Sequence, residues 1–254
     1  MTLMKTSLYL FTLLFILFFN ASCKTLKGVK EMKTETINLK EYSNGLKDVA
    51  FIGIHHVGKI SYYANLTETI KSYKEKGYTV FYEQLSETNI VNDSSKLDIE
   101  NRKMRKIVGF YSGATGYGSI IEDFKKTGLK SFTAFANKLM VQPSYEIMGL
   151  DSLDYNADAN RTNFVAEFEA RFGGLVLDSM DYHTHLDSAY SRPNVVSKSK
   201  KKKIIVDYRN EVLAKNTLNS KEEKILIIFG EGHRKGFYKI LKKEDKNWKK
   251  IKSA

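Results

Sequence analysis

The sequence of 254 residues predicts an α/β fold with a mixed, mainly parallel sheet built from two related halves and a helical insertion between them. The leading observation is that one short motif, Gly-x-x-His, occurs twice, at 53–56 and at 230–233. Each copy follows an apolar run rich in β-branched and aromatic residues, which is typical of a buried strand. A helical pattern comes after each copy. We therefore expect two strand–Gly-x-x-His–helix units, each with one histidine at the carboxyl end of a strand, where α/β sheets build ligand sites.

The first half is predicted to be a βαβ unit. A strand is expected over 49–54 and a helix over 61–76, where apolar side chains recur every three or four residues. Gly77 is placed to end this helix. A second strand over 79–82 leads to Glu83. The strands of such a unit are parallel, and we expect these two to be neighbours in the sheet.

The insertion is predicted to be mainly helical. Residues 94–138 have a loose helical pattern that is broken at 109–118, where glycines and aromatic residues form either a lid or a plain turn. Another helix is expected over 163–172. The polar segment 178–203 contains Pro193 and a lysine run, so we expect it to be an exposed loop.

The last part of the chain is predicted to return to the sheet. Residues 204–206 are either a strand or the start of a buried helix. The strand over 225–229 carries the second motif, and a helix that includes Leu241 follows it.

The N-terminal residues are predicted to be a signal peptide. Lys5 precedes the apolar run from Leu8 to Phe19, which is too short to span a bilayer. Small residues then lead to Cys23, the only cysteine, and this pattern resembles a bacterial lipoprotein signal with the lipid on Cys23. The alternative is ordinary secretion with a buried or reactive thiol. Both place the protein outside the cytoplasm, and a lone cysteine forms no intrachain disulfide.

This interpretation divides the chain into three parts. Residues 1–22 are a lipoprotein signal peptide, 23–46 are a tether, and 47–254 form a single domain. The expected location is the bacterial cell envelope, with the membrane reached through the lipid anchor.

The chain is basic, with a formal net charge of +12. Much of the excess lies in the lysine-rich segments 198–203 and 242–252. A solvated loop and a frayed tail would explain them, and adhesion to an anionic bilayer is the alternative. We expect no nucleic-acid partner, because aromatic residues that could stack on bases do not interleave with these lysines.

Four residues are the candidates for a site: His56, His233, Glu83 and Arg209. Histidine is a common metal ligand, and the repetition of the motif favours a shared site over two turns with helix-capping histidines. Glu83 would be a metal ligand or a base, and its alternative is a surface glutamate. Arg209 would hold a carboxylate or a developing oxyanion, and its alternative is a structural salt bridge.

Further polar residues are weaker candidates. His55 alternates with His56 and is expected to point elsewhere. Glu231, inside the second motif, competes with Glu83 for the same role. His183 and His185 lie in a polar segment and are expected to be a surface coincidence.

In combination, these segments resemble the TraB/PrgY/GumN family, which includes the Wnt-cleaving TIKI proteins. The similar segments are a strand with Gly-x-x-His-Val, a strand ending in glutamate, an Ala-Asp element, an arginine-bearing helix and a closing strand with Gly-x-x-His, at 51–58, 80–83, 156–158, 207–210 and 225–241. The resemblance implies two related halves and a metal-dependent hydrolase or peptidase site with roles for His56, Glu83, Arg209 and His233. Relatives in the wider superfamily include erythromycin esterases and a haem-binding lipoprotein.

Three functions follow as hypotheses. In the first, His56 and His233 hold a divalent metal ion that activates water for attack on an amide or ester, with Glu83 as ligand or base and Arg209 on the oxyanion. In the second, the histidines bind haem or a metal without turnover. In the third, a degraded site leaves a lipoprotein that acts only in envelope interactions.

Overall fold

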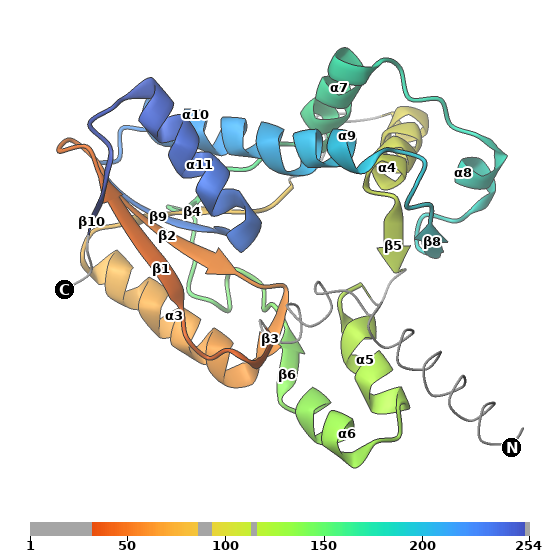
Figure 1. The fold of residues 1–254 in the computed structure, drawn as a ribbon, viewed down its shortest axis with the longest axis horizontal. Helices are drawn as coiled ribbons and strands as arrows, with labels where there is room; N and C mark the ends of the chain where they lie inside the picture. The colour runs from red at the N-terminus through yellow and green to blue at the C-terminus, as the bar shows by residue number, and fades with distance from the viewer. Residues whose placement is uncertain (1–31, 86–92, 113–115, 252–254) are drawn as a thin grey trace, which may run out of the picture.

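The computed structural model describes residues 32–85, 93–112 and 116–251, and its centre is a six-stranded sheet (Figure 1). The strand order is β10-β1-β2-β9-β4-β7. Strands β2, β9, β4 and β7 are parallel, whereas β1 pairs antiparallel with β2 and β10. The prediction of a mixed, mainly parallel sheet is confirmed. The strands are β1 Asn38–Ser43, β2 Asp48–Ile54, β4 Thr79–Tyr82, β7 Tyr155–Asn156, β9 Lys224–Gly230 and β10 Lys249–Ile251.

Different helices cover the two faces of the sheet (Figure 1). Along β2, Ala50 and Ile52 pack toward α3, while Val49 and Phe51 pack toward α10 and α11. This alternation follows from the two-residue period of a strand. Because both faces are buried, the strand is continuously apolar rather than alternating. The helices α3, α10 and α11 span Ile60–Glu75, Arg209–Asn219 and Glu231–Glu244.

The strand order corrects one expectation. β2 and β4 are parallel, as predicted, but they are not neighbours, because β9 lies between them and pairs with both. The central place suits β9, since every side chain of Ile225–Phe229 is fully buried. Glu83, which follows β4, is therefore next to the second motif rather than the first.

The sheet also includes chain that was expected to lie outside it. β1 lies within the predicted tether 23–46, and its Tyr42 stacks on Tyr238 with ring centroids 4.6 Å apart. Near the other end, Trp248 is fully buried, so the lysine-rich segment 242–252 is not a frayed tail as far as Ile251. In both places one large aromatic side chain anchors a segment of polar average composition. The predicted signal 1–22 and Cys23 lie outside the described residues.

A second group of helices packs beside the sheet. Residues from α4, α7 and the π-helix η2, such as Ile107, Phe168 and Ile204, form a separate apolar cluster. The helices and the small strand pair of this region are α4 Ser94–Val108, α7 Arg161–Phe172, α8 Ser179–His183, α9 Lys198–Lys202, η2 Lys203–Tyr208, β5 Phe110–Ser112 and β8 Ala189–Ser191. The helix predicted over 163–172 is confirmed as α7, and 204–206 belong to a helix with Ile204 buried.

The segment 178–203 is not the exposed loop that its composition predicts. It contains α8, β8 and α9, and the side chains of Asp181 and Tyr190 are buried. These polar groups can be buried because they form hydrogen bonds and ion pairs with one another and with charged residues of α4. The average composition of the segment does not reveal such pairing.

A helical hairpin follows the break in the insertion. Its helices are α5 Gly118–Lys126 and α6 Lys130–Ala136. The strand β6 Leu139–Val141 comes next and pairs with β3 Val57–Lys59. None of the helices in the described part of the chain combines the length and the apolar character that a bilayer crossing needs.

Candidate functional site

The carboxyl edge of the parallel strands gathers the predicted site residues. β2 and β9 are neighbours in a register that sets Ile54 opposite Gly230, so the two motif copies leave the sheet at the same edge. Glu83 follows β4, and Asp158 follows β7. We call six residues the edge cluster: His56, Glu83, Asp158, Arg209, Asn210 and His233. The first copy of the motif leads into β3 before its helix, whereas the second enters α11 directly.

Glu83 is the centre of the edge cluster. One carboxylate oxygen, Oε1, accepts a hydrogen bond from Nη2 of Arg209 at 2.5 Å, and the other accepts one from the backbone N–H of Gly230. The hydroxyl of Tyr145 donates to the backbone carbonyl of Glu83. The side chain is only 9% exposed. Glu83 is therefore not the surface glutamate of the alternative interpretation.

Arg209 joins two carboxylates. Its Nε and Nη2 donate to Asp158 at 2.8 and 2.5 Å, and Nη2 also reaches Glu83. Burial would lower the pKa of Arg209, but hydrogen bonding to Asp158 and the charge of Glu83 raise it above its usual range. Nη1 makes only a long contact of 3.4 Å to the carbonyl of Ile205. Arg209 therefore forms the structural salt bridge of the alternative interpretation. Its Nη1 is still able to donate a further hydrogen bond.

His233 is held in one orientation by Asn210. Its Nδ1 lies 3.0 Å from Oδ1 of Asn210, and an amide oxygen only accepts, so Nδ1 carries the proton. The lone pair of the neutral ring is then on Nε2, which lies 3.8 Å from Oε1 of Glu83. Gly236 makes this contact possible, because a Cβ there would meet Nδ2 of Asn210 at 2.2 Å.

His56 completes the edge cluster from the β2 side. Its Nδ1 lies 3.1 Å from Oε1 of Gln142, and its ring stacks on Tyr117 at 4.7 Å between centroids. An electrostatic influence of His56 is the smallest of those that act on the pKa of His233. Tyr117, at the start of the helical hairpin, covers His56.

The electrostatics keep the two central groups ready to bind a cation. Burial and then the charge of Arg209 lower the pKa of His233 below 6.5, so its imidazole is neutral at pH 7. Burial alone would raise the pKa of Glu83, but Arg209, His233 and the Gly230 N–H lower it overall, so the carboxylate stays ionised. Two carboxylates, those of Glu83 and Asp158, face one guanidinium, and the balance favours a cation.

The donor set fits a divalent metal ion in its chemistry. His56, His233 and Glu83 make a two-histidine, one-carboxylate set, which catalytic zinc sites use. A separation of 3.8 Å allows Nε2 of His233 and Oε1 of Glu83 to share an ion at about 2.1 Å from each. A carboxylate oxygen with one hydrogen bond still has a free lone pair. Within the described residues, however, no three His, Cys, Asp or Glu side chains already stand in metal-binding geometry.

The weaker candidates have other contacts. Glu231 accepts hydrogen bonds from Asn38 at 3.1 Å and from Arg234, and it fills the space beside Gly53. The carbonyl of His55 accepts a hydrogen bond from Tyr63 at 2.6 Å, and its ring lies near Tyr62.

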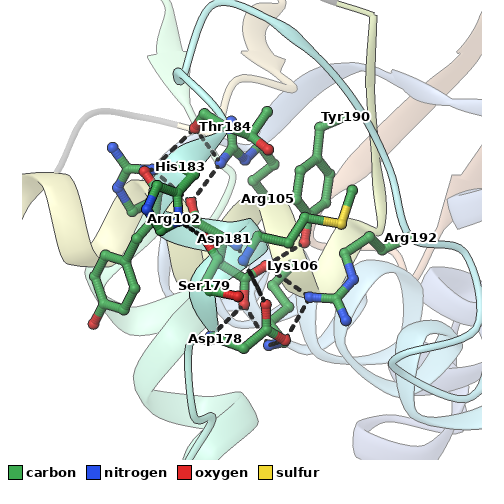
Figure 2. Close-up of polar contacts among 12 residues, drawn as sticks. Arg102, Arg105, Lys106, Asp178, Ser179, Asp181, His183, Thr184, Tyr190 and Arg192 are labelled. Carbon is green, nitrogen blue, oxygen red and sulfur yellow. Dashed lines mark hydrogen bonds and ion pairs between the residues drawn. The ribbon is translucent and has the colours of Figure 1, made fainter.

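His183 and His185 belong to a different region, shown in Figure 2. Both side chains are exposed, and His183 ends α8 rather than lying on a strand. The backbone carbonyl of His185 accepts a hydrogen bond from Arg105 at 2.8 Å. The charged groups of this region form the α4–α8 network, which we define as Arg102, Arg105, Lys106, Asp178, Asp181, Tyr190 and Arg192. Lys106 and Asp181 are buried in it, whereas Asp178 is exposed.

Two members of the edge cluster were not predicted as site residues. Asp158 follows β7, a strand of only two residues that leaves no apolar run to detect. Its one signal was the Ala-Asp element at 157–158. Asn210 stands beside Arg209 in sequence, but its role depends on the close approach of α10 and α11 at Gly236.

Comparison with models of protein families, with curated proteins and with solved structures finds no match to this chain.

Proposed function

We propose that this protein is a metal-dependent hydrolase of the peptidase or esterase type, held at the cell envelope by a lipid on Cys23. The observation that carries the proposal is the orientation of His233: Asn210 holds Nδ1, and the unprotonated Nε2 points to the ionised Glu83 at 3.8 Å. A histidine oriented by a hydrogen bond at its second nitrogen is the usual form of a metal ligand.

His56, His233 and Glu83 would hold the ion. When bound, a divalent metal lowers the pKa of a water ligand and polarises a carbonyl oxygen. The chain's own residues divide the remaining work. Asn210 fixes the tautomer of His233, Asp158 anchors Arg209, and Nη1 of Arg209 is the donor available to a developing oxyanion.

The proposal includes membership of the TraB/PrgY/GumN group and a sheet of two related halves. Support comes from the segments that resemble the family and from the parallel register of β2 and β9, which places the two motif copies at the same edge. The lipid on Cys23 and the envelope location rest on the N-terminal sequence alone. Mass spectrometry of the mature N-terminus tests them: an unacylated terminus in membrane-extracted protein contradicts the anchor.

Metal titration of the purified protein tests the site. We expect about one Zn²⁺ or Mn²⁺ per chain, and we expect His233→Ala to lower the affinity at least about 100-fold, since changes in residues behind metal ligands already cost 10–100-fold. His183→Ala is the matched control, because it removes an exposed histidine outside the edge cluster. Equal binding by the His233 and His183 variants would contradict the metal site.

Turnover separates hydrolysis from the alternative, capture of haem or a metal without chemistry. A panel of chromogenic amides and esters should be hydrolysed by the metal-loaded protein, and a chelator should stop the reaction. Metal binding without any turnover, or binding of haem in place of the ion, supports capture.

A further inference from the structure

A groove of about 960 Å³ is lined by residues of α9, η2, α10 and α11. Its apolar lining includes Val206, Leu218 and Ile240, and the two glycines of α11 also line it. Six lysines and three carboxylates line it, and no aromatic side chain does. The charged residues are Lys202, Lys203, Lys215, Lys235, Lys239, Lys243, Asp207, Glu211 and Glu244.

The lysines of α11 form a row along this groove. Lys235, Lys239 and Lys243 are four residues apart, so they lie on one face of the helix at intervals of about 6 Å. Like charges at this spacing destabilise a helix by a few tenths of a kcal/mol per pair. All three side chains are exposed, and none of them has an ion pair within the described residues.

The carboxylates of the groove do not neutralise this row. Asp207 already pairs with Lys202 at 3.3 Å and with Lys203 at 3.1 Å. Glu211 pairs with Arg171, which lies outside the groove, at 2.7 Å. Glu244 is the third carboxylate, and it has no ion pair within the described residues. Six lysines and three carboxylates give the groove a formal charge of 6 − 3 = +3, and the row on α11 carries three of its positive charges.

We propose that this groove binds a linear polyanion that carries phosphate groups along a chain without bases. A concave row of evenly spaced lysines follows a chain, whereas a flat bilayer meets only outward-facing side chains. Nucleic acid fits less well, because bases need aromatic platforms and the groove has none. The groove and the edge cluster share Asn210, which lines the groove, but no groove lysine belongs to the edge cluster.

Inorganic polyphosphate is a suitable probe, because it is a linear chain of phosphates with no base. Affinity is measured by titration at several salt concentrations for the wild type and for the triple variant Lys235→Gln, Lys239→Gln, Lys243→Gln. Glutamine matches lysine in helix propensity. The control is Lys71→Gln, Lys126→Gln, Lys130→Gln, which removes three exposed lysines from other helices with the same change in net charge.

We expect the wild type to bind polyphosphate with a steep salt dependence and to bind monomeric phosphate far more weakly, because multivalent contacts add. The groove variant should lose about tenfold in affinity and the control less than about twofold, from contacts of several tenths of a kcal/mol each. Equal losses in both variants would mean diffuse attraction and would overturn the proposal. The proposal would also be overturned if the wild type bound oligo(dT) or anionic vesicles more tightly than polyphosphate and the groove variant lost that binding. The groove would then be a site for that ligand. Thermal melting of both variants excludes misfolding as the cause.

Discussion

Two buried networks of charge lie in this molecule, and they differ in how completely their groups are paired. In the α4–α8 network, Lys106 pairs with Asp178 and Asp181, and Asp181 also accepts from Tyr190 at 2.6 Å and from Arg192 at 3.3 Å (Figure 2). Apart from Nε of Arg105, its charged groups have protein partners. Such a network holds α8 and β8 onto α4 and has no capacity for a ligand.

The edge cluster also pairs carboxylates with an arginine, but it remains incomplete. Nε2 of His233 has no hydrogen bond within the described residues, and it lies 3.8 Å from Glu83, beyond hydrogen-bonding distance. Two carboxylates share one arginine. The comparison indicates that a buried charge network suggests a binding site only when an oriented group in it lacks a partner.

The largest expected effect comes from removing the cation of each network. Lys106→Met and Arg209→Met should each destabilise the protein by about 3–5 kcal/mol, because each removes the nearest cation from a buried carboxylate. The two should differ when Zn²⁺ is added. At about 100 times its dissociation constant, the ion stabilises a chain with an intact site by about 2.7 kcal/mol, so Lys106→Met should gain as much as the wild type. Arg209→Met should gain more, because the ion also replaces the lost cation beside Glu83 and Asp158.

Thermal melting with and without Zn²⁺ measures both effects. A Zn²⁺-dependent rise in melting temperature for Lys106→Met that exceeds the rise for wild type would remove the distinction between the networks. The absence of any rescue in Arg209→Met would show that Glu83 and Asp158 do not attract a cation.

The same distinction explains what the sequence could predict. β2, α3, β4 and β9 were predicted within one or two residues, because their apolar runs and helical spacing directly reflect burial. The approach of Glu83 to His233 was also predictable, since carboxyl ends of parallel strands share one edge. The position of β9 between β2 and β4 was not, because it is a long-range pairing with no local signal.

Buried polar groups account for most of the errors. The polar composition, Pro193 and the lysine run made the segment 178–203 look like a loop, although Asp178 and Asp181 order it by pairing with Lys106. Asn210 was overlooked for a related reason, since its contact with His233 exists only where two helices approach closely. Composition reports how polar a residue is, but it does not report whether a partner satisfies it.

Two glycines one turn apart on α11 test whether Asn210 orients His233 for metal binding. Gly236→Ala should push Asn210 away from His233 and lower metal affinity about 10–100-fold, because residues that orient ligands have effects of this size. Gly232→Ala is the matched control, since a Cβ there meets no atom within 4 Å. Both changes improve helix propensity by up to about 1 kcal/mol, so a loss of affinity in Gly236→Ala alone cannot come from a weaker helix.

Metal titration of both variants decides this point. Equal affinities would mean that Asn210 does not orient His233. The edge cluster would then not differ from the α4–α8 network in holding an oriented group ready for a ligand.

The tandem histidines provide a smaller test of register. His56→Ala should lower metal affinity about tenfold or more, whereas His55→Ala should change it less than about twofold, because neighbours in an extended segment face opposite ways. His56 faces Gln142 and Tyr117, while the ring of His55 lies near Tyr62. Equal losses, or a loss only in His55→Ala, would contradict the assignment of His56 as the ligand.

The smallest effects are the pH dependences, which place the two networks in different windows. The pKa of His233 is lowered from 6.5, mainly by burial, so its native form is neutral and resists protonation. Metal affinity should therefore stay constant from pH 8 down to 6.5 and fall only below that, as protons begin to compete for Nε2. As the pH is lowered, the unfolded chain takes up a proton on this histidine before the native chain does. The free energy of unfolding therefore decreases as the pH drops below 6.5, by at most about 1.4 kcal/mol per pH unit.

The α4–α8 network should respond only in acid. Burial would raise the pKa of Asp181, but hydrogen bonds from Lys106 and Tyr190 lower it overall, below 3.8. Its contribution is therefore fully present above pH 3.8 and is lost as the pH falls through the lower native pKa. Melting curves of the wild type, His233→Ala and Asp181→Asn between pH 8 and pH 3 separate the windows. His233→Ala should abolish the change below pH 6.5 and keep the acid transition. Asp181→Asn should reduce the acid transition without abolishing it, because the pKa of Glu83 is lowered as well, and it should keep the change below pH 6.5. If one substitution removes both transitions, the two networks are coupled, and the pH response of the edge cluster depends on the α4–α8 network.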